Sequence, residues 1–166
     1  MEEIIGGLLR QKGLWLTAAE SCTGGLLGHR ITNIPGSSEY YLGSVTAYTC
    51  EVKEALLGVK HHTLLTYGAV SREAVIEMAQ GVRRVLSVGF PLEKVIGVSI
   101  SGIAGPGGGL PGKPVGTVWV GLSTADGDRA WQFLWQGDRI EIKMNSAQAA
   151  LQLVADYLSD CLPSEA

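Results

Sequence analysis

The chain has 166 residues, of which 46% are hydrophobic and 17% are charged, and its formal net charge is −3. This composition is typical of one compact domain over residues 1–166 and excludes a disordered chain. The small negative charge also excludes a general attraction to nucleic acid or to an anionic membrane surface.

The three cysteines, Cys22, Cys50 and Cys161, are odd in number and have no CxxC spacing. Neither a disulfide framework nor a zinc site is therefore expected. The first residues, Met1-Glu2-Glu3, are acidic where a secretory signal is basic, and no apolar run approaches the ~20 residues that span a bilayer. We expect a soluble cytoplasmic protein with reduced thiols and no membrane partner.

The N-terminal part of the chain predicts a helix, a strand and a second helix. Apolar residues at helical spacing predict the first helix over residues 2–12, and a buried strand follows over residues 14–19. The strand ends at Glu20-Ser21-Cys22-Thr23-Gly24-Gly25, and helical spacing resumes between residues 23 and 34. Ser21 is thus predicted at a strand-to-helix corner, where α/β proteins place their chemistry.

Two interpretations of this corner remain open. Free backbone N–H groups at a helix start, near Thr23, Gly24 and Gly25, can accept a phosphate or stabilise an oxyanion. Alternatively, Ser21 and Thr23 only cap the helix, because serine and threonine are common N-cap residues.

The middle of the chain predicts a strand over residues 40–48 and two helices. Thr49 is the expected N-cap of the first helix, which ends at Gly58, and Ser71 is the expected N-cap of the second. His61-His62 is expected in the polar connection between them as a solvated pair. The apolar residues on one face of the second helix are expected in the core: Ala74, Val75, Met78, Ala79, Val82, Val85 and Leu86.

The C-terminal part predicts a buried strand over residues 95–100, a long loop to Pro114, and strands over 115–124 and 129–136 joined through Asp126-Gly127. A last helix begins at Asp138, with Glu141 completing a capping box, and continues to about residue 159. Helices that alternate with strands indicate a parallel sheet covered on both faces. We therefore predict a three-layer α/β/α domain with a mixed, mostly parallel sheet that includes one antiparallel hairpin.

A serine nucleophile at the corner needs a base to take its proton. The histidines lack an acid at a recognisable triad spacing, and the chain has no Gly-x-Ser-x-Gly motif. Lys53 is the remaining candidate, since a position near a helix start and partial burial both favour its neutral amine. On spacing alone, a surface lysine on an ordinary helix is the favoured alternative. Tyr48 could hold Lys53 or the substrate, or could equally belong to the core.

The glycine-rich loop has the P-loop spacing from Gly107 to Lys113, but Pro114 stands where serine or threonine should bind magnesium, and a strand follows instead of a helix. An ATP-binding P-loop is therefore rejected. The loop either cradles a phosphate with its exposed N–H groups, aided by Lys113, or is only a surface connection. No cluster has metal-ligand spacing, so no metal and no cofactor are expected.

Several segments together resemble a known family, over about residues 3–158. They are Ala19-Glu20-Ser21-Cys22-Thr23-Gly24-Gly25, Pro35-Gly36-Ser37-Ser38, Tyr48 with Lys53, Tyr67-Gly68-Ala69-Val70-Ser71, Ser101-Gly102-Ile103-Ala104-Gly105-Pro106-Gly107-Gly108 and Lys113-Pro114-Val115-Gly116-Thr117-Val118. As a set they are similar to the CinA C-terminal domain, the nicotinamide mononucleotide deamidase family.

The resemblance implies a serine amidohydrolase that converts nicotinamide mononucleotide to nicotinic acid mononucleotide and ammonia in pyridine nucleotide recycling. It implies Ser21 as nucleophile, Lys53 as base and Tyr48 close by. It also implies a small-molecule nucleotide as the partner. The substrate site is expected at these residues: Thr23, Gly24, Gly25, Ser101, Gly102, Gly105, Gly107, Gly108 and Lys113.

This sequence departs from the family pattern at Cys50, where asparagine is frequent, at Ser101, where threonine is usual, and at Lys143, where arginine is common. Lysine lacks the bidentate fork with which arginine holds a phosphate or carboxylate. The chain is expected to be the stand-alone form of the family, and its apolar helix faces allow a homo-oligomer. A non-catalytic nucleotide-binding or regulatory domain, and a thiol amidohydrolase with Cys22 as nucleophile, are the alternative hypotheses.

Overall fold

The structure, a computed structural model, describes residues 1–165. Its α-helices are α1 (Glu2–Lys12), α2 (Leu26–Thr32), α3 (Cys50–Leu57), α4 (His61–Tyr67), α5 (Arg72–Leu86) and α6 (Arg139–Leu158). Its strands are β1 (Trp15–Glu20), β2 (Tyr41–Thr46), β3 (Val95–Gly102), β4 (Thr117–Thr124) and β5 (Gly127–Leu134). Two short 3-10 helices, η1 (Ser37–Glu39) and η2 (Leu92–Lys94), precede β2 and β3.

The five strands form one mixed sheet in the order β2-β1-β3-β4-β5. β1 is parallel to both β2 and β3, whereas β4 is antiparallel to β3 and to β5. The β4–β5 pair is the hairpin that Asp126-Gly127 predicts, since Thr124 pairs with Gly127 next to the turn. The parallel strands β2, β1 and β3 consequently end at the same edge of the sheet.

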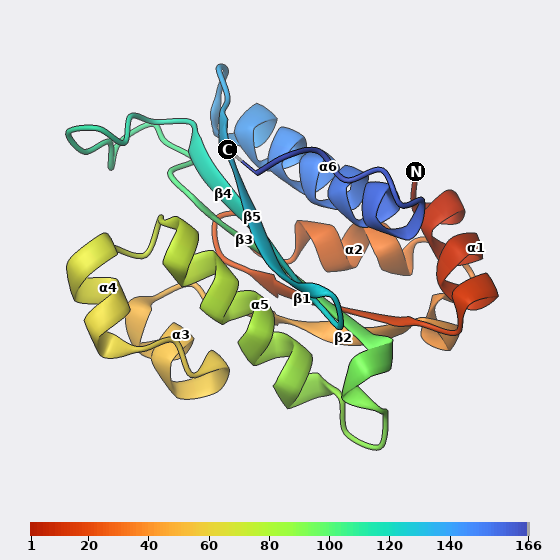
Figure 1. The fold of residues 1–166 in the computed structure, drawn as a ribbon. Coiled ribbons are helices and arrows are strands. Elements are labelled where there is room, and N and C mark those ends of the chain that lie inside the picture. Colours follow the sequence, from red (N-terminus) through yellow and green to blue (C-terminus); the bar gives the residue numbers. More distant parts are fainter. Residues whose placement is uncertain (166) are drawn as a thin grey trace.

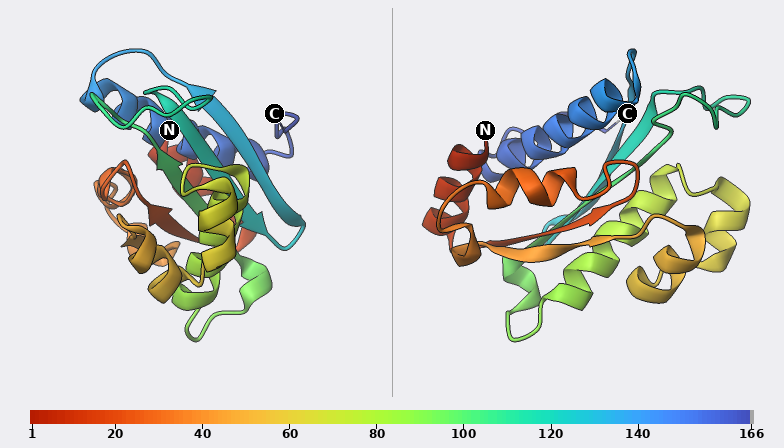
Figure 2. Two further views of the ribbon diagram at one scale, coloured as in Figure 1. Left: turned by 90° about the vertical axis from the view of Figure 1, so that its left-hand side faces the viewer. Right: turned by 180° about the vertical axis from the view of Figure 1, so that it is seen from behind.

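Helices cover both faces of the sheet (Figures 1 and 2). Helices α1, α2 and α6 lie on one face, where α6 contacts β3, β4 and the other two helices. Helices α3, α4 and α5 lie on the opposite face, where α5 packs directly on the sheet. The predicted three-layer α/β/α architecture is therefore confirmed.

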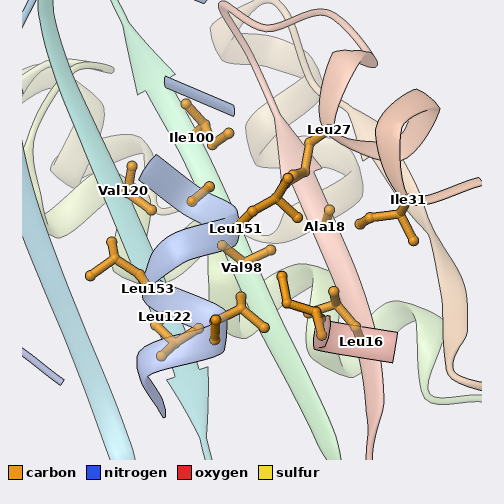
Figure 3. Packing of buried hydrophobic residues seen from close by; sticks show 14 of the residues in the cluster. Leu16, Ala18, Leu27, Ile31, Val98, Ile100, Val120, Leu122, Leu151 and Leu153 are labelled. Atoms are coloured by element: carbon orange, nitrogen blue, oxygen red, sulfur yellow. The ribbon is translucent and has the colours of Figure 1, made fainter. Parts of the chain in front are cut away.

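The larger hydrophobic core lies between the sheet and the helices α1, α2 and α6 (Figure 3). Leu16 and Ala18 of β1 both point to this core, because alternate residues of a strand point to the same face, and Leu27 of α2 lies beside Ala18. Leu151 of α6 packs against Val98 of β3 in the same cluster. This core fixes the first turn of α2 against the end of β1, next to Ser21.

Local signals located most elements well. The first helix has the predicted bounds, and Thr49, Ser71 and the Asp138–Glu141 capping box begin α3, α5 and α6 as expected. The predicted apolar face of α5 is buried up to Val82 and Leu86 is partly buried, but Val85 is 41% exposed.

Two local expectations were wrong. His61 and His62 lie in the first turn of α4, although both are exposed, as a solvated pair would be. The helix after the corner begins at Leu26 rather than at Thr23, and its N-cap is Gly25, without a side-chain cap. The interpretation in which Ser21 and Thr23 cap this helix is therefore also wrong.

Candidate active site

Ser21 and Lys53 meet at the carboxyl edge of the parallel strands. Ser21 directly follows β1, and its N–H extends the sheet by donating to the carbonyl of Ile100 in β3 (2.9 Å). Lys53 lies in α3, which follows β2 after a short connection. Their side chains lie 3.0 Å apart, from Lys53 Nζ to Ser21 Oγ.

Lys53 is a buried lysine, with only 1% of its surface exposed. Its Nζ donates to the carbonyl oxygens of Ala47 (2.8 Å) and Tyr48 (3.3 Å). A neutral amine has two N–H donors and one lone pair. The three N–H groups of an ammonium can donate to Ser21 Oγ and to both carbonyls. In the neutral form the two carbonyls take both N–H groups, and the Ser21 hydroxyl can donate to the lone pair instead.

Burial lowers the pKa of Lys53, because the ammonium loses its hydration in this position. The negative forms of Cys50, Cys22 and Glu51 act in the opposite direction and raise it, but desolvation is the larger effect. A lysine with a lowered pKa beside a serine hydroxyl can accept a proton, which an ordinary ammonium cannot.

The turn that carries Ser21 is shaped by Glu20 and the two glycines. Gly24 and Gly25 have φ angles of +62° and +97°, a region that favours glycine. The buried Glu20 carboxylate accepts N–H donors from Gly25 (3.0 Å), Leu27 (3.0 Å) and Gly28 (2.9 Å).

This contact corrects the expectation that the helix start offers free N–H groups to a phosphate or an oxyanion. Glu20 already uses the donors of the first turn. The N–H groups of Cys22 and Thr23, just after the serine, have no acceptor within residues 1–165. They are the donors of this turn that stay available to a ligand.

A cavity of about 310 Å³ opens in front of the Ser21–Lys53 pair. Of the sequence-predicted site residues, Ser21, Tyr48, Lys53, Ser101, Gly102, Gly105, Gly107 and Gly108 line it. The cavity is also lined by Cys22, Cys50, Ala69, Val70, Ile103, Ala104 and Arg139. The start of the glycine-rich loop therefore belongs to the cavity wall.

The tip of that loop lies elsewhere. Lys113 does not line the cavity, because its Nζ donates to the carbonyl oxygen of Tyr67 at the end of α4 (2.6 Å). Leu110 and Lys113 form an isolated bridge with two backbone hydrogen bonds, and the loop extends beyond the sheet there (Figure 1). The expected direct contact between Lys113 and a substrate is therefore not part of this arrangement.

Three more predicted residues lie next to the cavity without lining it. Thr23 is fully buried, and its hydroxyl has no partner within the described chain. Gly25 donates its N–H to Glu20, so it supports the turn. Gly24 faces Lys143, whose Nζ would lie 3.8 Å from a Cβ at that position.

Arg139 is the charged cavity residue that sequence reasoning missed. It lies in the first turn of α6, where it donates to the carbonyl of Gly105 (2.6 Å) and to the hydroxyl of Tyr48 (2.8 Å). It thereby joins three segments around the cavity mouth. The Asp138 capping box was a usable signal, because it predicts the helix start and hence the position of Arg139.

Tyr48 is 57% exposed, so it is not a core residue.

The Cys22 thiol is disfavoured as a nucleophile. Cys22 is 5% exposed, and burial raises its pKa to about 11. A thiol reacts as its thiolate, so a protonated, buried Cys22 is inert at neutral pH. Ser21, which has a base within hydrogen-bond distance, is the better nucleophile of the two.

Within residues 1–165, no group of three or more histidine, cysteine or acidic side chains is arranged to hold a metal ion. Over the same residues, none of the helices combines the length and hydropathy needed to cross a bilayer.

The fold and the Ser21–Lys53 pair define an α/β protein with a serine–lysine site at the ends of its parallel strands. The sequence model of the CinA C-terminal domain matches residues 1–158. The chain belongs to this family.

Similar proteins carry the same family names. The chain is 45% identical over 159 residues to a CinA-like protein of Salinibacter ruber, covering 96% of this chain and 37% of that protein. It is 48% identical over 155 residues to a putative competence-damage inducible protein of Halothermothrix orenii, covering 93% of this chain and 36% of that protein. The chain thus spans little more than a third of the length of these relatives.

Solved structures agree with the fold. The competence or damage-inducible protein of Enterobacter asburiae superposes with a TM-score of 0.87 at 30% identity, with 95% of each chain covered. The competence/damage inducible protein of Agrobacterium tumefaciens gives a TM-score of 0.81 at 33% identity, covering 95% of this chain and 94% of that chain.

Proposed function

We propose that the protein is a serine amidohydrolase that converts nicotinamide mononucleotide to nicotinic acid mononucleotide and ammonia, as part of pyridine nucleotide recycling in the cytoplasm. The observation that carries the proposal is the buried Lys53 amine 3.0 Å from Ser21 Oγ. In the neutral amine the carbonyls of Ala47 and Tyr48 take both N–H groups, which leaves the lone pair for the Ser21 hydroxyl. The substrate is taken from the family resemblance of the sequence motifs.

In the proposed reaction the Lys53 amine takes the Ser21 proton while Oγ attacks the carboxamide carbon. The carbonyl oxygen becomes an oxyanion, which the free N–H groups of Cys22 and Thr23, in the turn that carries Ser21, can stabilise. Collapse breaks the C–N bond, and the Lys53 ammonium returns its proton to the departing nitrogen as ammonia. The same amine then takes a proton from water, whose oxygen attacks the ester carbon. The C–Oγ bond breaks, the acid leaves, and the Lys53 ammonium returns its proton to Ser21 Oγ.

The phosphate of the substrate needs a cation at the cavity, and Arg139 supplies one. Its hydrogen bonds to Gly105 and Tyr48 use two of the five N–H groups of the guanidinium, so others remain for an anion. Lys113 is engaged by the Tyr67 carbonyl instead. We therefore assign the phosphate to Arg139 and not to the tip of the glycine-rich loop.

The test is the conversion of nicotinamide mononucleotide by the purified protein, followed by chromatography of the nucleotide and by an enzymatic assay of ammonia. We expect both products in equal amounts, and neither with Ser21→Ala. Calorimetric binding of the nucleotide without any turnover would instead identify a non-catalytic nucleotide-binding domain.

A further inference from the structure

Glu20 is a fully buried carboxylate outside the cavity wall. Its side chain folds back under the turn that follows it and accepts three backbone N–H groups, from Gly25, Leu27 and Gly28. Within residues 1–165 no lysine or arginine forms a salt bridge with it. The carboxylate is therefore held by backbone donors alone, and it closes the turn on which Ser21 lies.

The backbone of the same residue reaches the lysine. The Glu20 carbonyl accepts the N–H of Ala47 (2.8 Å), and the Ala47 carbonyl in turn accepts Lys53 Nζ (2.8 Å). The Ser21 N–H is fixed from the other side by Ile100. Ser21 is thus bonded directly to Glu20 as the next residue, and Lys53 is linked to Glu20 through two hydrogen bonds.

We propose that Glu20 is a positioning residue that sets the distance between Ser21 Oγ and Lys53 Nζ, its carboxylate holding the serine turn and its carbonyl holding Ala47. This inference rests on the proposed function, in which the pair does the chemistry. It assigns to Glu20 no contact with the substrate.

The surroundings of the carboxylate leave it little freedom. A Cβ on Gly28 would lie 2.8 Å from Ser44 Oγ, 2.9 Å from Tyr41 Oη and 3.5 Å from Glu20 Oε1, so these groups gather in one tight space. The pKa of Tyr41 is raised to about 12, by burial first and by the charge of Glu20 as well. The space therefore admits no large reorientation of the glutamate.

The chemical requirement is for two acceptor oxygens. Glu20→Gln keeps the shape of the side chain but replaces one oxygen by an NH₂ group, which would face a backbone N–H as donor against donor. At least one of the three N–H groups then loses its partner, and the turn shifts. A displacement of about 1 Å at a reacting group can reduce the rate about 100-fold.

The experiment compares wild type and Glu20→Gln by steady-state kinetics with nicotinamide mononucleotide and by titration of the ¹³Cε signal of Lys53 in lysine-labelled protein. We expect kcat to fall 10- to 100-fold with KM within about threefold, because the substrate does not touch Glu20. The pKa of Lys53 should rise toward the ordinary lysine value as the loosened pair admits water. The variant leaves unchanged the ionisable groups that act on the pKa of Lys53, which are Cys22, Cys50 and Glu51. A change in this pKa would therefore report the altered position of the pair.

Glu77→Gln is the matched control. Glu77 of α5 accepts the N–H of Lys60 (2.8 Å) and the hydroxyl of Thr63 (3.0 Å), so it also supports a helix start with a carboxylate. It lies outside the cavity wall. We expect this variant to lose stability but to keep kcat and the Lys53 titration.

Each outcome decides one question. Wild-type kcat and an unmoved Lys53 titration in Glu20→Gln would overturn the inference. Lack of turnover by the wild type would contradict the proposed function, and the Lys53 titration alone would then decide whether Glu20 sets the pair. Should Glu20→Gln fail to fold, Glu20→Asp keeps both oxygens but draws them back by one methylene from the N–H groups of Gly25, Leu27 and Gly28. This variant must show the same fall in kcat, or the inference fails.

Discussion

Lys53 Nζ lies 3.0 Å from Ser21 Oγ, although the two residues are 32 positions apart in the sequence. Two parallel strands make the contact possible, because β1 delivers Ser21 and β2 delivers the connection to α3 at the same edge of the sheet. The carbonyls of Ala47 and Tyr48 complete the surroundings of the amine. The geometry therefore depends on backbone atoms of the sheet edge, and it makes the following outcomes testable.

Ser21→Ala should abolish amide hydrolysis and leave the fold intact. The substitution removes only Oγ, whose partner is Lys53, while the Ser21 N–H keeps its bond to Ile100. We expect a loss of at least ~10³-fold in kcat, as for other nucleophile deletions. Ammonia release at the wild-type rate by a folded Ser21→Ala protein would reject the serine mechanism.

The activity of the wild type should rise with pH through a pKa below the ordinary value of lysine. Burial lowers the pKa of Lys53, and only the neutral amine accepts the serine proton. The rate is therefore low below this pKa and levels off above it. Lys53→Arg keeps a cation that does not titrate in this range, so it should be nearly inactive at every pH. A pH profile of kcat/KM for both proteins checks this.

The same pKa shift should appear in protein stability. The unfolded chain keeps the Lys53 proton up to the ordinary lysine pKa of about 10.4, whereas the folded protein releases it at lower pH. Between these two values the unfolded state binds more protons, so this lysine makes the free energy of unfolding rise with pH, by at most about 1.4 kcal/mol per pH unit.

Urea unfolding of the wild type and of Lys53→Met at several pH values isolates this effect. The variant lacks the titrating amine, so its stability relative to the wild type should fall as the pH rises through the window. A difference that is independent of pH would mean that the folded protein does not lower the pKa of Lys53.

Iodoacetamide should abolish the proposed activity through Cys50 and not through Cys22. Cys50 is exposed and lines the cavity, whereas Cys22 is buried and burial raises its pKa to about 11. Alkylation of Cys50 places a new group in the cavity mouth. Cys50→Ala should therefore be resistant, and mass spectrometry should find Cys22 unmodified in the folded protein. Resistance that appears only in Cys22→Ala would favour the thiol hypothesis instead.

Elements with local signals could be predicted from the sequence, whereas α4 could not. Thr49 and Ser71 are side-chain caps, so the starts of α3 and α5 are visible in the sequence. The N-cap of α4 is Lys60, which makes no side-chain cap, and the N–H of Lys60 is satisfied by Glu77 from α5. A helix start completed by a residue 17 positions later leaves no local pattern.

The candidate site likewise contains residues that local patterns predict and residues that they do not. The strand end at Ser21 and the helix start before Lys53 follow from local patterns, and family motifs pair the two residues. The role of Glu20 could not be predicted from local patterns. Nothing in the sequence shows that the carboxylate of this strand residue folds back and accepts the N–H groups at the start of α2. Arg139 lies 91 positions from Tyr48, and only the packing of α6 brings them together.

Arg139 should decide how strongly the enzyme prefers nicotinamide mononucleotide over nicotinamide riboside, which lacks the phosphate. It is the arginine that lines the cavity, and its bond to Gly105 aims it at the start of the glycine-rich loop. A hydrogen bond to a charged group contributes about 1.5–3 kcal/mol, so Arg139→Ala should reduce kcat/KM for the mononucleotide about 10- to 100-fold.

Arg139→Ala also removes the hydrogen bond to Tyr48, and that loss affects both substrates alike. The ratio of kcat/KM for the mononucleotide to that for the riboside therefore isolates the phosphate contribution, and we expect the ratio to approach one in the variant. Lys94→Ala is the control. It removes an exposed cation just before β3, at the end of the parallel strands opposite the cavity, and should leave the ratio unchanged. If the ratio in Arg139→Ala equals that of the wild type, backbone N–H groups or Lys143 hold the phosphate instead of Arg139. If the wild type itself has equal kcat/KM values for the two substrates, the phosphate lies outside the cavity altogether.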